Sequence, residues 1–308
     1  MTNKLRSHRL LAITLLLLIL CAVTTPLAQT PTDPTEEYDV VKIDTNLVTL
    51  NVSVTKKDHP VTGLVTEDFQ ILDNGANVKP EFFDAQSPAS IIFVLDVSTS
   101  MRGERWKNLR RGLKQFLKEQ KEASDYTLIT FNECPRLISQ SIDASDFWKI
   151  FTTLKPDGET ALYDGLSVAL DQTRALPRRN KAIVLLSDGE DNRSSNTLAT
   201  VQQKVLATNT TIYAVGLLLD KRKSGPESRG QKLLIDVAAS TGGLSFFPTA
   251  QEIEKTLQKI TADITNQYSF GYYPLNKTPG WRTVEVNLLK TNLRRSTKLR
   301  YQKRYMFK

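Results

Sequence analysis

The sequence predicts an α/β fold: a doubly wound, mostly parallel sheet with helices on both faces, plus a small β-sandwich formed by the two flanks of the chain. Two observations lead to this prediction, and a third identifies a segment outside the fold. Between about residues 89 and 267, continuous apolar strands alternate with helical stretches, which is typical of a parallel sheet covered by helices. Residues 40–88 and 268–308 have strand patterns and no helical period. Residues 1–28 have the composition of an export signal.

The N-terminal segment, residues 1–28, is expected to be a signal peptide. Three basic residues, Lys4, Arg6 and Arg9, precede an apolar run from Leu10 to Val23, and small residues allow cleavage after Ala28. The run is shorter than the roughly 20 residues that cross a bilayer as a helix. We therefore expect a secreted or periplasmic protein; an uncleaved N-terminal membrane anchor is the alternative, and membrane contact is expected only in that case.

The next segments are expected to be a linker, residues 29–39, and a β segment, residues 40–88. The linker is polar and rich in Thr and Pro. Apolar and polar residues alternate strictly over Val48–Val54, which predicts a half-buried strand. Phe69–Leu72, before an Asp-Asn-Gly turn, and Pro80–Phe83 are also expected to be extended.

Residues 89–267 are expected to form the α/β domain. Apolar segments of the fully buried strand type lie at Ile91–Leu95, Leu128–Phe131, Ala182–Leu186, Ile212–Leu217 and Leu244–Phe247. Helical stretches lie at Trp106–Ala123, Asp146–Leu154, Leu162–Leu176, Leu198–Thr208, Leu233–Ala239 and Glu252–Ile264. Their alternation predicts the doubly wound sheet.

The C-terminal segment, residues 268–308, is again β. Extended patterns occupy Tyr268–Pro274, Thr283–Leu288 and Lys298–Tyr305. Neither flank is large enough to bury a core by itself. We expect residues 40–88 and 268–308 to combine into one sandwich with the α/β domain inserted between them; two separate β appendages are the alternative.

The composition excludes several classes of function. His8 and Cys21 lie in the predicted leader, so the mature chain of this 308-residue sequence keeps one histidine, His59, and one cysteine, Cys134. An intrachain disulfide and a His-rich zinc site are thereby excluded, and no P-loop, G-x-S-x-G or CxxC motif is present. The net charge of +8 is too small for a nucleic-acid-binding surface. We do not expect an enzyme.

Five oxygen-bearing side chains are predicted to meet at one edge of the sheet. Asp96, Ser98 and Ser100 follow the first strand of the α/β region, Thr160 precedes a helix, and Asp188 follows another strand. Ligands of open α/β sheets bind outside the carboxyl ends of the strands. Two carboxylates and three hydroxyls suit a hard cation such as Mg²⁺ or Mn²⁺.

The sequences Asp96-Val97-Ser98-Thr99-Ser100, Gly158-Glu159-Thr160 and Ser187-Asp188-Gly189 resemble the von Willebrand factor type A domain, in which they form the metal-ion-dependent adhesion site. The resemblance covers about residues 90–267. It implies direct hydroxyl ligands at Ser98, Ser100 and Thr160, and aspartates that bind directly or through water. It also implies Mg²⁺, with Mn²⁺ or Ca²⁺ as alternatives. The flanks are similar to exported bacterial proteins of this group, which again implies a location outside the cytoplasm.

The function expected from these features is an exported, divalent-metal-dependent protein-binding module, its metal site completed by an Asp or Glu of a partner protein. One alternative is a structural or assembly factor of the cell envelope in which the metal mainly stabilises the fold; another is a metal-dependent hydrolase.

Four of the five site residues also have a purely structural interpretation. Asp96, Ser98 and Thr160 could cap helices, and Asp188 could belong to a turn.

Charged residues near the predicted site are given roles of their own. Asp164 is expected to brace the Thr160 loop, and Glu190 and Asp191 to be solvated. Two interpretations remain for Arg102 and Arg105: they belong to an ordinary solvated surface, or they form a basic rim that attracts an acidic partner.

Overall fold

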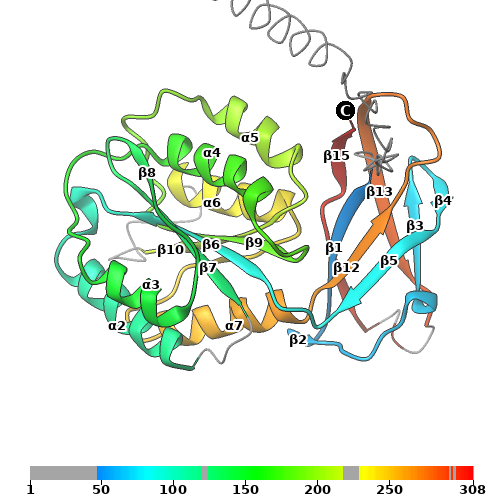
Figure 1. Cartoon of the computed structure of the whole chain (residues 1–308), viewed down its shortest axis with the longest axis horizontal. Coiled ribbons are helices and arrows are strands. Elements are labelled where there is room, and N and C mark those ends of the chain that lie inside the picture. The colour runs from blue at the N-terminus through cyan, green and yellow to red at the C-terminus, as the bar shows by residue number, and fades with distance from the viewer. Residues whose placement is uncertain (1–46, 120–123, 218–228, 291–292, 294–295, 308) are drawn as a thin grey trace, which may run out of the picture. The chain divides into compact units, whose positions relative to one another are not determined.

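The computed structural model describes residues 47–307 except for 120–123, 218–228, 291–292 and 294–295 (Figure 1). The predicted signal peptide, the linker and the end of the expected helix Trp106–Ala123 lie outside the described residues. Residues 44–308 form one compact unit. Within the described part of the chain, no helix is long and apolar enough to cross a membrane.

A six-stranded sheet forms the centre of the α/β region, in the order β11-β10-β9-β6-β7-β8. Its strands are β6 (Ser90–Asp96), β7 (Asp125–Phe131), β8 (Pro135–Ile142), β9 (Lys181–Ser187), β10 (Thr211–Gly216) and β11 (Ser245–Phe246). All pairs are parallel except β7–β8. Every residue of β6 is buried, because helices cover both faces of the sheet.

In the described part of the chain, six helices cover the two faces of this sheet (Figure 1). One face carries α2 (Glu104–Glu119), α3 (Ala144–Phe151) and α7 (Ile253–Thr265). The other carries α4 (Leu162–Gln172), α5 (Leu198–Leu206) and α6 (Arg229–Ser240). Each layer buries its own apolar cluster against the sheet. The predicted doubly wound fold is confirmed.

Strand β8 is the longest described strand that was not expected from the sequence; the short strands β2 (His59–Pro60) and β4 (Ala76–Val78) were not expected either. Strand β8 is the edge strand of the sheet, antiparallel to β7, and none of its residues is buried. The pairing is irregular near Leu128, and Ser141 has a φ of 50°. An exposed, distorted strand lacks both apolar alternation and a continuous apolar run, so its sequence shows no strand pattern.

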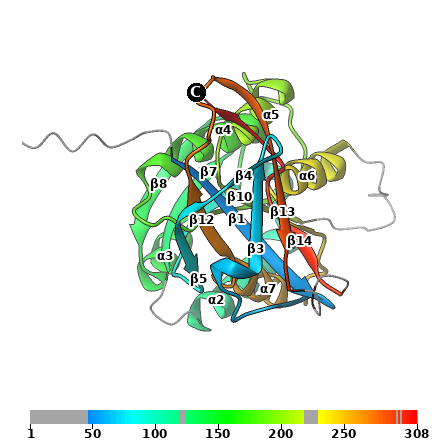
Figure 2. The same cartoon turned by 90° about the vertical axis from the view of Figure 1, so that its right-hand side faces the viewer.

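The flanks of the chain form two antiparallel sheets around a third apolar core (Figure 2). One sheet has the order β14-β1-β12-β5 with β2 beside β1; the other has the order β15-β13-β3-β4. The strands before the α/β region are β1 (Val48–Lys56), β2 (His59–Pro60), β3 (Phe69–Asp73), β4 (Ala76–Val78) and β5 (Pro80–Ala85). Those after it are β12 (Tyr268–Tyr272), β13 (Gly280–Leu288), β14 (Lys298–Arg300) and β15 (Arg304–Phe307).

The two flanks share strand ladders. Val48–Val52 of β1 pair with β12, and Phe69–Asp73 of β3 pair with β13. The predicted sandwich is therefore confirmed, and the alternative of separate appendages is wrong. The expected strand Lys298–Tyr305 is instead broken into β14 and β15, which belong to different sheets. Buried Gln302 lies at the break, where its amide donates to the carbonyl oxygens of Leu206 and Arg304.

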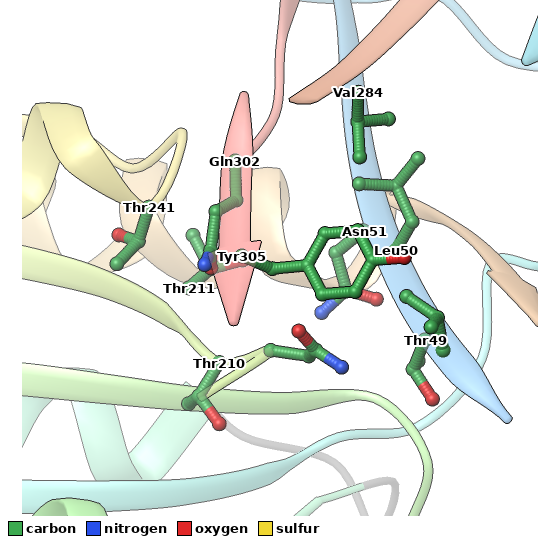
Figure 3. Close-up of a pocket in the computed structure, with 11 residues that line it drawn as sticks. Thr49, Leu50, Asn51, Thr210, Thr211, Thr241, Val284, Gln302 and Tyr305 are labelled. Carbon is green, nitrogen blue, oxygen red and sulfur yellow. The ribbon is translucent and has the colours of Figure 1, made fainter. Parts of the chain in front are cut away.

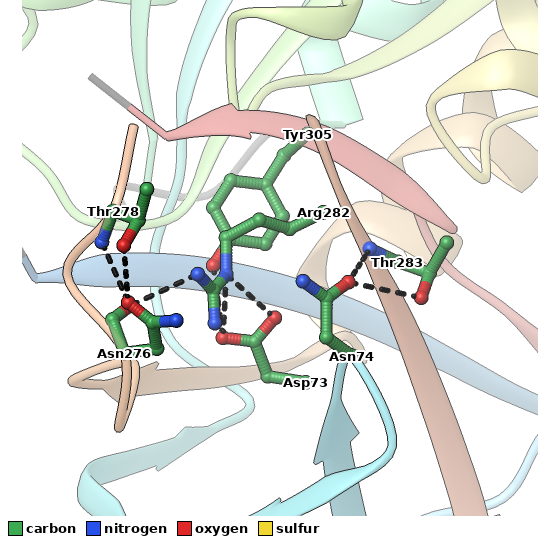
Figure 4. A network of polar contacts seen from close by, with 7 residues as sticks. All are labelled: Asp73, Asn74, Asn276, Thr278, Arg282, Thr283 and Tyr305. Carbon is green, nitrogen blue, oxygen red and sulfur yellow. Dashed lines mark hydrogen bonds and ion pairs between the residues drawn. The ribbon is translucent and has the colours of Figure 1, made fainter. Parts of the chain in front are cut away.

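A buried ion pair joins the strands of the second sheet (Figure 4). Arg282 Nε donates to both carboxylate oxygens of Asp73, each at 3.0 Å, and Arg282 Nη1 donates to the carbonyl oxygen of Asn276 at 2.9 Å. The hydroxyl of Tyr305 donates to Asp73 at 3.1 Å. Because both charges have several partners, their burial is compensated.

Polar side chains connect the sandwich to the α/β region. Asp263 of α7 accepts from Tyr213 of β10 and from Arg300 of β14, both at 2.5 Å. A cavity of about 10 Å³ lies nearby, between β1 and the start of β10 (Figure 3). It offers room for no more than a water molecule, so it is not a ligand site.

Candidate functional site

The site begins at the carboxyl end of β6, where the buried strand ends in a carboxylate. Asp96 Oδ1 accepts from the backbone N–H of Ser98 at 2.9 Å, and Oδ2 accepts from the hydroxyl of Ser187 at 2.7 Å. Burial raises the pKa of Asp96 to about 6, against the opposing effect of the hydrogen bonds from Ser98 and Ser187. Asp96 is thus a fixed, buried acid with its oxygens oriented by neighbours.

Two serine hydroxyls follow Asp96 on a short loop. The hydroxyl oxygens of Ser98 and Ser100 lie 3.1 Å apart and share a hydrogen bond. Ser100 is part of a single 3₁₀ turn, Thr99–Met101. Ser98 occupies the N-cap position of that turn but its side chain makes no capping hydrogen bond. The capping interpretation of Ser98 therefore fails, and the two hydroxyls point to a common place.

Thr160 lies on the loop before α4 and is fastened to the loop after β9. Its backbone N–H donates to the side-chain oxygen of Asn192 at 2.9 Å, and its carbonyl oxygen accepts from the N–H groups of Asn192 and Arg193. The N-cap of α4 is Ala161, so Thr160 is not the capping residue. Thr160 is buried, and its position is fixed by its backbone.

Asp188 follows β9 and faces an arginine. Its Oδ2 accepts from Nη1 of Arg105 at 3.0 Å, and its Oδ1 accepts from the N–H of Glu190 at 3.3 Å. The same Nη1 donates to the carbonyl oxygen of Ser100 at 2.7 Å. Arg105, which the sequence left open, therefore joins Asp188 to the serine loop.

Backbone hydrogen bonds connect the serine loop to the Thr160 loop. Asp157 N donates to the carbonyl oxygen of Val97 at 2.7 Å, and Thr99 N donates to that of Gly158 at 2.9 Å. With the contacts above, the three loops that carry the predicted residues are held to one another. Side-chain bonds link Asp96, Ser98, Ser100 and Asp188 to this cluster, and Thr160 is linked through its backbone.

The neighbouring acids have structural partners. Asp164 accepts from the N–H groups of Ser195 and Asn196, so it braces the loop after β9 and not the Thr160 loop as expected. Asp191 accepts from Tyr163 N at the start of α4 and from the hydroxyl of Ser194. Both carboxylates are therefore engaged in hydrogen bonds that hold the loops.

Sequence reasoning did not identify the residues that orient the site. Ser187, which fixes Asp96, and Asn192, which fixes Thr160, are an ordinary serine and asparagine beside the motif. The position of Ser187 directly before Asp188 was an available signal, whereas Asn192 lies four residues after Asp188 and had none. Their roles depend on which loops meet, and that is visible only in the fold.

A hollow of about 380 Å³ lies at the opposite, amino-terminal edge of the sheet and includes Arg174, Arg178 and Lys181. Arg178 pairs there with Asp125 at 2.8 Å. Across the described ranges, no cluster of three or more His, Cys, Asp and Glu side chains forms a metal site.

The predicted donor set fits a hard divalent cation by its chemistry. It contains two carboxylates and three hydroxyls and no nitrogen or sulfur, which is the chemistry that Mg²⁺, Mn²⁺ and Ca²⁺ bind. The buried Asp96 and Asp188 are close enough for the charge of Asp188 to raise the pKa of Asp96 further. A cation between them would relieve both the burial and the repulsion.

Comparison with known proteins agrees with this fold. The von Willebrand factor type A domain family matches residues 91–190. Inter-alpha-trypsin inhibitor heavy chain H2 of Sus scrofa is 25% identical over 215 residues, 63% of this chain and 22% of that protein. The Homo sapiens protein of the same name is 27% identical over 149 residues, 43% of this chain and 16% of its own length. The chain thus spans about a fifth of the length of these curated relatives.

A solved structure, von Willebrand factor type A from Catenulispora acidiphila, has a TM-score of 0.47 and 11% identity, covering 86% of this chain and 74% of that one. The family match includes all five predicted site residues within residues 91–190. It coincides with the first part of the doubly wound sheet, from β6 through β9. The chain therefore contains a region, residues 91–190, that matches the von Willebrand factor type A domain.

Proposed function

We propose that this protein is an exported, divalent-metal-dependent protein-binding module. Asp96, Ser98, Ser100, Thr160 and Asp188 would hold Mg²⁺, or Mn²⁺ or Ca²⁺ in its place. The observation that carries the proposal is the pair of serine hydroxyls 3.1 Å apart beside the buried Asp96 carboxylate. A bound cation supplies an open coordination position, which an Asp or Glu of the partner protein would complete.

The tight linkage of the three loops favours recognition over a purely stabilising metal. The protein's own hydrogen bonds, such as those from Asn192 to Thr160 and from Thr99 to Gly158, already hold the loops together. A metal is therefore not needed to assemble them. Its main contribution would be a positive charge directed at a partner, which favours an acidic contact residue.

Hydrolysis has less support from the site. His59 lies on β2 of the sandwich, away from the carboxyl end of β6. Among the described residues around Asp96, the polar neighbours are hydroxyls, an arginine and the Asp188 carboxylate. Both carboxylates are already assigned to the proposed metal, so no further general base is left beside it. A binding role uses every residue of the proposed set without such a base.

The test is metal-dependent capture from the envelope fraction of the source organism. The whole chain is immobilised in Mg²⁺ and bound proteins are released with EDTA. Asp96→Ala with Ser98→Ala should abolish capture, and Ser240→Ala, which loses only a hydroxyl bonded within its own helix, should retain it. Captured proteins should be displaced by millimolar glutamate. Equal capture in EDTA, or by the double variant, would show that the proposal is wrong.

A further inference from the structure

An arginine already occupies one side of the proposed metal site. Arg105, in the first turn of α2, donates from Nη1 to Asp188 Oδ2 at 3.0 Å and to the carbonyl oxygen of Ser100 at 2.7 Å. The side chains of Arg105 and Asp188 are 18% and 5% exposed. A largely buried positive charge therefore lies against one of the two carboxylates proposed to serve the metal.

We propose that Arg105 is a built-in competitor of the divalent ion. It holds Asp188 and the serine loop in the absence of metal, and its hold on Asp188 loosens when metal binds. This inference rests on the proposed function, since it concerns the occupancy of the same site.

Electrostatics requires such competition. A guanidinium remains protonated at any physiological pH, so Arg105 cannot give up its charge as a lysine or histidine could. A divalent cation that uses Asp188 would lie within a few ångströms of it, where like charges in a poorly hydrated place repel strongly. Either Arg105 moves or the ion binds more weakly.

The hydrogen bonds of Arg105 are of a kind that can be broken when a metal ion binds. Its Nε is buried and has no hydrogen-bond partner in the part of the chain that the structure describes. Both of its polar contacts come from the single atom Nη1. A guanidinium with an unsatisfied donor is held less firmly than one whose donors are all used.

Two consequences in opposite directions follow. Without metal, Arg105 stabilises the loops, so its removal should lower the melting temperature. With metal, Arg105 opposes binding, so its removal should raise the affinity. A purely structural arginine would give the first effect without the second.

The experiment titrates Mg²⁺ alone into the whole chain by calorimetry and records thermal unfolding with EDTA and with Mg²⁺. Compared with the wild type, Arg105→Gln should bind Mg²⁺ roughly tenfold more tightly and have a lower melting temperature in EDTA. Its melting temperature should also rise more when Mg²⁺ is added. Arg105→Lys keeps the charge but has a single donor group, so its affinity should fall between the two.

Arg102→Gln is the matched control. It removes the same charge from the same segment, but Arg102 is 55% exposed and pairs with Asp157, outside the proposed ligand set. Its Mg²⁺ affinity should stay within about twofold of the wild type, because exposed charges are screened.

The outcomes separate the two proposals. If the wild type binds Mg²⁺ through Asp96 but Arg105→Gln binds it equally or more weakly, Arg105 is no competitor and the metal site stands. An equal gain in Arg102→Gln also overturns the inference, because a general change of charge would then explain it. If no form binds Mg²⁺, both proposals fail. If Arg105→Gln does not fold, a weaker affinity in Arg105→Lys contradicts the competition.

Discussion

Two arginine–aspartate pairs in this protein have the same chemistry and different environments. In the sandwich, Arg282 and Asp73 are 6% and 0% exposed, and Arg282 Nε contacts both carboxylate oxygens. At the sheet edge, Arg105 and Asp188 are 18% and 5% exposed, and Arg105 Nε has no partner among the described residues. In the first pair, the arginine Nε is hydrogen-bonded to the carboxylate. In the second pair, the arginine Nε is left without a hydrogen-bond partner.

The difference indicates two roles. A buried pair with every group satisfied is costly to disturb, so Arg282 and Asp73 fasten strands of the sandwich permanently. A pair with an unsatisfied donor, beside a set of oxygen ligands, can exchange partners at lower cost. The first pair therefore serves stability and the second serves the site.

The largest expected effect is in the sandwich. Asp73→Ala leaves the Arg282 guanidinium buried without its carboxylate, so the free energy of unfolding should fall by about 3–5 kcal/mol. Urea denaturation measures this. Asp84→Ala, which breaks a partly exposed pair with Arg179 at 3.6 Å, should cost less than about 1 kcal/mol. Similar losses for both variants would contradict the special role of the sandwich pair.

The next effect concerns orientation of the proposed ligands. Ser187→Ala removes the 2.7 Å hydrogen bond to Asp96 Oδ2, so the Mg²⁺ affinity should fall by about 10- to 100-fold. Calorimetric titration measures the change, with Ser240→Ala as the control. The Asp73→Ala variant should keep its Mg²⁺ affinity if it folds, because its defect lies in the sandwich. A change below twofold in Ser187→Ala would show that Asp96 needs no such support.

The smallest effect is expected at a surface pair near the site. Arg102 and Asp157 are 55% and 74% exposed although they lie 2.6 Å apart. Arg102→Ala should change the free energy of unfolding by less than about 1 kcal/mol, since exposed ion pairs contribute little. A loss above about 2 kcal/mol in urea denaturation would mean that short distance, and not burial, decides the strength of these pairs.

Much of the fold could be predicted because its signals are local. The continuous apolar run ending at Asp96 reflects a strand buried on both faces. The alternation over Val48–Val54 marks a strand correctly, but the expected half-burial is wrong, because the polar Asn51 and Ser53 are buried as well. Strand β8 could not be predicted, because an exposed edge strand needs no apolar pattern. The break at Gln302 depends on contacts with residues far away in the sequence, such as Leu206.

The meeting of the three loops that carry the proposed ligands was predictable to a similar extent. Asp96, Ser98, Ser100, Thr160 and Asp188 could be chosen because parallel strands end at one edge of the sheet. The residues that hold these side chains in place could not be predicted from the sequence. Arg105 is 83 residues from Asp188 in the sequence and Ser187 is 91 residues from Asp96, so only the folded chain brings each pair together.

The central claim is that a divalent cation binds at the carboxyl end of β6. The most direct test is calorimetric titration of Mg²⁺ into the whole chain and into the variant with Asp96→Ala and Ser98→Ala. We expect saturable binding of a single ion by the wild type and none by the variant, with both folded by circular dichroism. Equal binding by the two proteins, or none by the wild type in Mg²⁺, Mn²⁺ or Ca²⁺, would contradict it.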